Sequence, residues 1–210
     1  MRINLAKSQI DDALPRVASG LKQYLWLQEN LYASDVSANR NYQRRFNRFY
    51  RVRMGPEWQH AFYGLLENAK GKSVVFREIL SAMLVATNRC EASFSSKLLA
   101  TVNPDMPVID SIVLGNLQLR RPAGSRHDRV CRFQELHAEL LARFKAFLAT
   151  EDGEYLVSRF RKAYPHADIT QIKMLDLVLW QTRPKQTQHG SCADRPTMAP
   201  RMLWDAGQGE

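Results

Sequence analysis

The chain has 210 residues, of which 45% are hydrophobic, which is enough to bury a core in one domain and excludes disorder throughout. A total of 30 lysines and arginines against 21 acidic residues gives a formal net charge of +9, which favours a polyanionic partner, nucleic acid first and an anionic membrane surface second. No apolar run has the length of a signal peptide or a membrane span, and three widely spaced cysteines form no disulfide framework, so we expect a protein of the reducing cytoplasm without membrane contact.

Apolar residues recur at helical spacing along most of the chain, and no segment shows the sustained alternation of a strand. The first stripe, over residues 14–25, includes Pro15, so we expect its helix to begin close to this proline. Residues 74–76, Val-Val-Phe, are the one strand-like run, but the helical stripe over 76–84 favours a helix there.

The second half of the chain carries the clearest periodicity. It predicts a helix of about six turns over 130–148, with Asp128 as a candidate N-cap. A shorter helix is predicted over 153–164, and Asp168 is the candidate cap of the last helix, which runs through 172–180.

These elements predict an all-α, globular multi-helix fold. Residues 1–183 are expected to form a single helical domain, in which two lobes would flank a cleft near 88–112. From residue 184 onward Gln, Thr, Gly and Pro replace the periodic pattern, so 184–210 is expected to be a flexible C-terminal tail.

Residues 40–53 contain six arginines and four aromatic residues, with no acidic residue among them. Helical spacing favours an amphipathic helix with the aromatic side chains in the core. The arginines are either its solvated face or a nucleic-acid-binding surface, because guanidinium groups suit phosphate oxygens. The candidates for this contact are Arg44, Arg45, Arg48 and Arg51.

A second basic cluster lies in the predicted loop 120–132. Its candidate nucleic-acid-binding residues are Arg120, Arg121 and Arg126, and Gly124 and Ser125 would offer backbone amides to a phosphate. A plain exposed loop explains the same residues. The two clusters flank a third segment in the sequence, residues 93–111, which contains the residues with chemical potential.

Lys97 stands in an apolar helical segment, and Asp110 follows the apolar pair Val108-Ile109 at the start of another. Either Lys97 extends to solvent along an apolar surface, or it is partly buried, which would lower the pKa of its amine and make it a nucleophile. Asp110 is also a natural N-cap, with Ser111 as the alternative. Capping is compatible with catalysis, because helix amides stabilise the charged form of a carboxylate that can then stabilise a developing cation.

The segment from Ser96-Lys97 to Pro107-Val-Ile-Asp110-Ser-Ile-Val-Leu resembles the lysine-to-aspartate segment of the helix-hairpin-helix DNA glycosylases. Lys173-Met-Leu-Asp176-Leu-Val-Leu-Trp180 resembles the final helix of the archaeal-type 8-oxoguanine glycosylase branch of that superfamily. The resemblance implies Lys97 as the catalytic nucleophile, Asp110 as the catalytic charge stabiliser, and Asp176 and Trp180 as substrate-binding residues. The Gly-rich hairpin that precedes the lysine in the family is absent here, where Arg89-Cys-Glu-Ala-Ser-Phe-Ser-Ser stands instead.

The sequence therefore predicts a DNA-repair protein that resembles a base-excision glycosylase, with or without lyase activity, and favours DNA over RNA as its partner. Two alternatives stay open: a non-catalytic helical DNA- or RNA-binding module, and a helical domain that binds an acidic protein. We expect no cofactor, because neither a Walker loop nor a dinucleotide fingerprint is present. We also expect no metal, because the cysteines and histidines lack zinc-ligand spacing.

Overall fold

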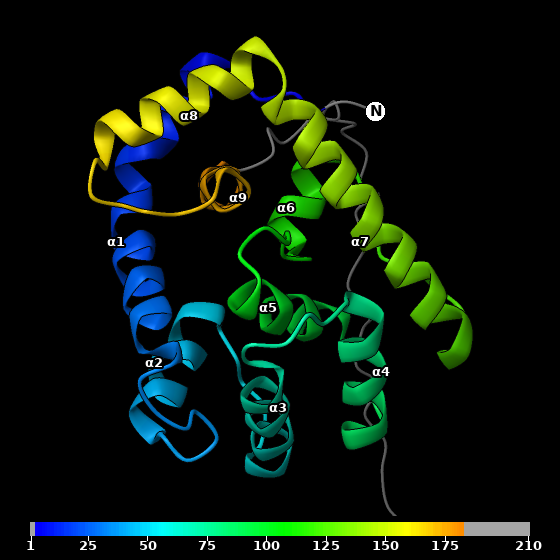
Figure 1. The fold of residues 1–210 in the computed structure, drawn as a ribbon. Coiled ribbons are helices and arrows are strands. Elements are labelled where there is room, and N and C mark those ends of the chain that lie inside the picture. The colour runs from blue at the N-terminus through cyan, green and yellow to red at the C-terminus, as the bar shows by residue number, and fades with distance from the viewer. Residues whose placement is uncertain (1–2, 183–210) are drawn as a thin grey trace, which may run out of the picture.

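The computed structural model of the protein describes residues 3–182, apart from the side chains of Arg126 and His127, and all regular structure in this part is helical (Figure 1). The predicted all-α class is confirmed for these residues, whereas the predicted tail, 184–210, lies outside them. In chain order the helices are α1 (Lys7–Leu31), α2 (Arg40–Tyr50), α3 (Pro56–Ala69), α4 (Phe76–Thr87), α5 (Ala92–Val102), α6 (Ser111–Asn116), α7 (Arg126–Leu148), α8 (Glu151–Ala163) and α9 (Gln171–Gln181).

The helices form two groups according to their packing. In the first group α9 contacts α1, α6, α7 and α8. In the second, α4 and α3 both pack against α5. The groups meet where α4 packs against α7, and α1 packs against α9 and also against α2 (Figure 1).

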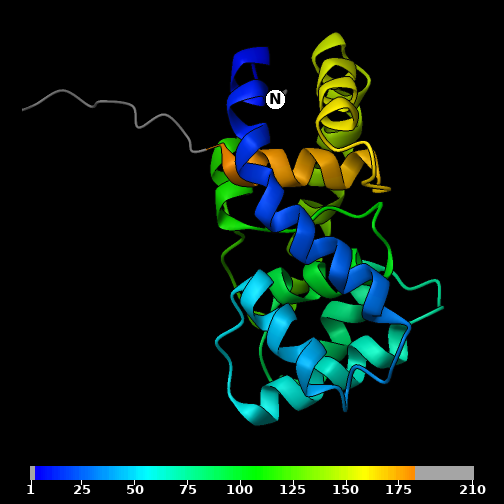
Figure 2. The same ribbon diagram turned by 90° about the vertical axis from the view of Figure 1, so that its left-hand side faces the viewer.

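Helix α9 is the centre of the first group, and Figure 2 shows it crossing between α1 and the α7–α8 pair. Its residues from Ile172 to Leu179 are all buried. A helix that is apolar on every side belongs inside a protein rather than on its surface. Lys173 and Asp176 are the two charged residues within this buried run, and they are discussed below.

Helix α1 begins earlier than the sequence predicts. The expectation that Pro15 lies near its start is wrong, because α1 begins at Lys7 and the proline is inside it. The turns before the proline are held by tertiary contacts: Asp11 accepts hydrogen bonds from Tyr155 Oη and Arg159 Nε of α8, each at 2.8 Å. Such contacts offset the cost of an interior proline, and Figure 2 shows α1 changing direction in its N-terminal half.

Two of the predicted helix caps are also wrong. Ser125 caps α7, where its Oγ accepts from the Asp128 amide at 3.3 Å, and Asp128 lies in the first turn. Thr170 caps α9 by accepting from the Lys173 amide at 3.2 Å, whereas Asp168 precedes it by two residues. A cap must stand directly before the helix to reach the unpaired first-turn amides. The cap at Ser125 also ends the predicted basic loop, because residues 126–132 belong to α7.

Candidate functional site

One small pocket lies where α2 and α5 of the lower half in Figure 1 meet α6 and α9. Lys97, Asp110, Asp176 and Trp180, the four residues that the sequence patterns single out, all line it. Its remaining walls are Phe49, Tyr50, Val108 and Leu177. The pocket has a volume of about 20 Å³, which leaves room for about one water molecule.

Lys97 is buried in this pocket, with 8% of its surface exposed. Its Nζ donates a long hydrogen bond of 3.4 Å to the Tyr50 carbonyl and lies 4.9 Å from the centre of the Phe94 ring. Among residues 3–182, the ion pairs within 4.0 Å do not include Lys97. Its ammonium therefore has no carboxylate in direct contact within this part of the chain.

The surroundings of Lys97 lower the pKa of its amine. Burial is the largest cause, because it removes water from the charged form. The negative charge of Asp110 opposes this effect in part, and the positive charge of Arg121 adds to it. At any given pH, the Lys97 amine is therefore unprotonated, and so nucleophilic, for a larger fraction of the time than the amine of a lysine exposed to water.

Asp110 lies at the start of α6 and is its N-cap, as the sequence predicts. Its Oδ1 accepts a hydrogen bond of 2.8 Å from the Ile112 amide. The residue before it is tied to α5, because the Ile109 amide donates to Ser96 Oγ at 2.9 Å. Ser96 is the neighbour of Lys97, so this bond holds the backbone before Asp110 against the turn of α5 that carries Lys97.

The same segment is held from its other side by α7. His137 is buried there, its ring stacks on Phe76, and its Nε2 lies 3.1 Å from the Pro107 carbonyl oxygen. Because a carbonyl only accepts, Nε2 carries the proton and donates it. Burial lowers the pKa of His137 to about 4, so this ring is neutral at physiological pH.

Asp176 is paired with a second buried lysine. Lys173 Nζ, with a side chain 1% exposed, donates to Asp176 Oδ2 at 2.8 Å and lies 4.9 Å from the centre of the Tyr24 ring. Burial is the largest single influence and lowers the pKa of Lys173, but the charge and hydrogen bond of Asp176, together with the Tyr50 and Tyr24 side chains, outweigh it and raise the pKa above the usual range. The two buried lysines thus differ in charge preference, because among the residues of the described range only Lys173 has a carboxylate in direct contact.

Sequence reasoning gave no role to Lys173. The signal that identifies it is a lysine three residues before an aspartate in a helix that is otherwise apolar, a spacing that places the two side chains on one face.

Aromatic residues of α2 and α9 form the outer wall of the pocket. The rings of Phe49 and Trp180 meet at 5.8 Å with an interplanar angle of 71°, and Arg51 lies 5.7 Å from the centre of the Trp180 ring. The sequence assigns Phe49 and Tyr50 to the core. They are indeed buried, but they also line the pocket, which periodicity alone does not predict.

The predicted basic residues do not gather around one site. Arg44, Arg45 and Arg48 lie on the exposed face of α2 and line a separate groove between α1 and α2. Arg51 and Arg121 lie nearer to the pocket: Arg51 is beside Trp180, and both lower the pKa of Lys97. Arg120 is exposed between α6 and α7, and Arg126 is the first residue of α7.

The segment before Lys97 is a helical hairpin without glycine. Helices α4 and α5 pack together, and residues 88–91 connect them. Asn88 has the left-handed backbone conformation, with φ of 56°, that ends α4. Asparagine tolerates this conformation better than other non-glycine residues, so the turn forms without the glycines of the resembled family.

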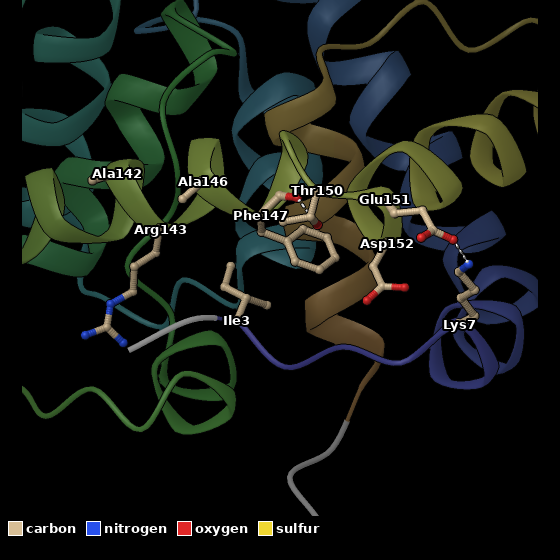
Figure 3. A pocket seen from close by; sticks show the side chains of 9 residues that line it. All are labelled: Ile3, Lys7, Ala142, Arg143, Ala146, Phe147, Thr150, Glu151 and Asp152. Carbon is tan, nitrogen blue, oxygen red and sulfur yellow. Dashed lines mark hydrogen bonds and ion pairs between the residues drawn. The ribbon is translucent and has the colours of Figure 1, made fainter.

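A larger pocket, of about 680 Å³, lies at the far end of the first group of helices, between the N-terminal segment and the α7–α8 junction. Figure 3 shows the Lys7–Glu151 pair at one end of this pocket and Arg143 at the other. Lys7 Nζ lies 2.6 Å from Glu151, and Arg143 is paired with Glu139 at 2.6 Å. Because its cations already have partners, this pocket offers less chemistry than the small one.

Within residues 3–182 no group of three or more His, Cys, Asp or Glu side chains is arranged to hold a metal ion. No helix in the same range is long and apolar enough to cross a membrane.

The chain matches no protein-family model, no curated protein and no solved structure. The glycosylase resemblance therefore stays a prediction from short motifs.

Proposed function

We propose that the protein is a DNA base-excision enzyme that resembles the helix-hairpin-helix DNA glycosylases, with Lys97 as its nucleophile. The observation that supports this proposal is a buried lysine that has no carboxylate partner within residues 3–182, in one pocket with a helix-capping aspartate. Structural lysines in protein interiors are normally paired, as Lys173 is. An unpaired buried amine with a lowered pKa is instead the arrangement that nucleophilic lysines use.

In this proposal the unprotonated Lys97 Nζ attacks C1′ of a deoxyribose. A bond from Nζ to C1′ forms while the bond from C1′ to the base breaks, and the electron pair leaves with the base. Asp110 stabilises the positive charge that develops on the sugar, and its carboxylate then accepts a proton from the nitrogen of Lys97. The C1′–O4′ bond then breaks, O4′ takes the proton back from Asp110, and the opened sugar is left joined to Lys97 through a protonated imine at C1′. The departed base takes its proton from water.

The target base would occupy the pocket against Trp180 and Phe49, with the carboxylate of Asp176 available to its hydrogen-bond donors. The pocket as described has room for about one water molecule, so the aromatic wall must move before a base enters. Trp180 is half-buried and stands in the last turn of α9, which makes it the wall residue with the most freedom to move.

Arg51 and Arg121 are placed to attract the phosphates next to the flipped nucleotide. Both are exposed, and both are close enough to Lys97 to affect the pKa of its amine. Binding of this kind would weaken as salt rises, because phosphate contacts release counterions.

Borohydride trapping tests the proposal, because hydride reduces the imine to a stable amine and links protein to DNA. One oligonucleotide should carry an abasic site, whose aldehyde needs only the amine, and others should carry damaged bases, including 8-oxoguanine. We expect the parent protein to trap, Lys97→Gln to fall to background, and Asp110→Asn to trap about 100-fold more slowly. Lys162→Gln, an exposed lysine of α8, is the matched control and should trap like the parent. The assignment is wrong if Lys97→Gln traps as well as the parent.

The basic groove between α1 and α2 supports a second candidate function, a non-catalytic DNA-binding module, because it lies apart from the pocket. Two results together would favour this module. The parent would trap on no substrate, and DNA binding would survive both Lys97→Gln and Asp110→Asn.

A further inference from the structure

A groove of about 610 Å³ runs between α1 and α2. This volume is in the range of pockets that hold a drug-sized molecule, such as one nucleotide. Ser19, Lys22, Gln23 and Trp26 line it from α1, and Arg44, Arg45 and Arg48 line it from α2. As far as the described part of the chain goes, the lining has four cationic side chains and no carboxylate.

The cations of this groove have no acidic partners in the part of the chain that the structure describes. The ion pairs among residues 3–182 include none of the four cations, Arg45 among them. Arg44 donates to Asn41 Oδ1 at 3.0 Å, which leaves its charge uncompensated. Four uncompensated cations around one hollow attract an anion with more than one charge, such as a strand with consecutive phosphates.

The groove also has an aromatic wall. Trp26 is half-buried, its inner side packs near Tyr42 with ring centres 6.2 Å apart, and the Arg45 guanidinium covers it at 4.1 Å from the ring centre. A guanidinium and a nucleobase are both flat groups that stack on indole. A base can therefore take the place that Arg45 occupies, while the released guanidinium turns to a phosphate.

Helix α2 connects this groove to the pocket. Arg44, Arg45 and Arg48 face the groove, and Phe49 and Tyr50 of the same helix line the pocket. From Arg44 to Arg51, which lies beside Trp180, the helix advances about 10 Å. About three stacked nucleotides of one strand cover that length.

We propose that the α1–α2 groove binds an unpaired nucleotide of single-stranded DNA, with its base on Trp26 and its phosphates on Lys22, Arg44 and Arg48. A duplex backbone needs only protruding cations, whereas an aromatic wall inside a basic hollow suits a base that has no pairing partner. This inference rests on the proposed function and names its substrate class: a target base in an unpaired strand, which costs less to extrude than a paired one.

Fluorescence anisotropy with an undamaged single-stranded oligonucleotide and its duplex tests this proposal without any catalysis. We expect the parent to prefer the single strand, and Trp26→Leu to bind it about 10-fold more weakly with little change for the duplex. Trp26→Phe, which keeps an aromatic face, should recover most of the affinity.

The charge part of the proposal has its own test. Lys22→Glu/Arg44→Glu should lower the slope of log Kd against log salt by about 1.4, about 0.7 for each lost phosphate contact. Lys72→Glu/Arg77→Glu makes the same change of charge on exposed residues outside the groove, and should leave the slope unchanged. Thermal melting of each variant checks that it is folded.

Three results would overturn the inference: parent-like single-strand binding by Trp26→Leu, equal losses on single strand and duplex, or equal slopes for the two charge-reversal variants. Competition by dTMP separates a strand from a free nucleotide, and an oligonucleotide no tighter than dTMP would also refute it. Failure of the glycosylase proposal is a separate outcome, because borohydride trapping reports on imine formation, whereas anisotropy with undamaged DNA reports on binding in the groove.

Discussion

The buried pair of Lys173 and Asp176 leads to a prediction whose size follows from the structure. Asp176→Asn removes the carboxylate 2.8 Å from Lys173 Nζ but leaves the lysine 1% exposed. Breaking a buried pair in this way costs about 3–5 kcal/mol of unfolding free energy. The lysine can also lose its proton, which sets an upper limit: at pH 7, neutralising a group with an ordinary pKa of 10.5 costs about 5 kcal/mol.

Because the cost of neutralising Lys173 depends on pH, the stability that Asp176→Asn loses depends on pH as well. In the variant, Lys173 would be neutral in the folded protein and charged in the unfolded chain, so the unfolded state binds more protons and stability rises with pH. At pH 9 the limit falls to about 2 kcal/mol. We therefore expect Asp176→Asn to lose about 3–5 kcal/mol at pH 7, and less at pH 9, relative to the parent at the same pH.

Urea unfolding followed by far-UV circular dichroism at the two pH values measures this difference. The double variant Lys173→Met/Asp176→Leu should recover most of the stability, because apolar residues of similar volume replace the pair. A loss below about 1 kcal/mol at pH 7, or a loss that is equal at both pH values, would refute the argument that Asp176 compensates a buried charge.

Two further predictions concern stability. The pKa of His137 is lowered to about 4, below its unfolded value near 6.5, so the unfolded chain takes up a proton that the fold excludes. The free energy of unfolding should therefore fall by about 3 kcal/mol as pH drops from 7 to 4 through this group alone. In urea titrations, His137→Gln should make the free energy of unfolding depend less on pH over this range. His60→Gln, a change at an exposed histidine, is the control and should not. Gly153→Ala would place its Cβ 2.2 Å from the Phe147 carbonyl oxygen, so we expect a loss of about 2–3 kcal/mol by calorimetry. Gly64→Ala, where nothing lies within 4 Å, should be neutral or stabilising, and similar values for the two variants would contradict the close approach at Gly153.

Sequence periodicity predicts the helices of this fold well because their apolar faces are long and regular. Helix α7 covers the predicted 130–148, and α2 buries its aromatic side chains while its arginines are exposed. The ends of the helices are harder to predict, since several short polar residues compete for each cap. Ser125, and not Asp128, is the N-cap of α7, because only the residue directly before the helix reaches the first-turn amides.

The placement of the pocket residues needed tertiary structure. Short motifs single out Lys97, Asp110, Asp176 and Trp180, but only the tertiary arrangement of α5, α6 and α9 brings them to one pocket. Nothing in the sequence indicates that Arg44, Arg45 and Arg48 form a groove with Lys22 and Trp26, because α1 and α2 are amphipathic helices whose relative rotation depends on the whole core. The roles of these residues stay predictions.

The small size of the pocket has a consequence for the cell in which the protein works. An unprotonated lysine amine reacts with sugars, aldehydes and acyl donors of metabolism, and a lowered pKa increases that hazard. Because the pocket beside Lys97 has room for about one water molecule, such metabolites do not fit into it while Trp180 and Phe49 keep their present positions. The aromatic wall would thus keep the amine free from adventitious glycation and acylation until a much larger ligand displaces it.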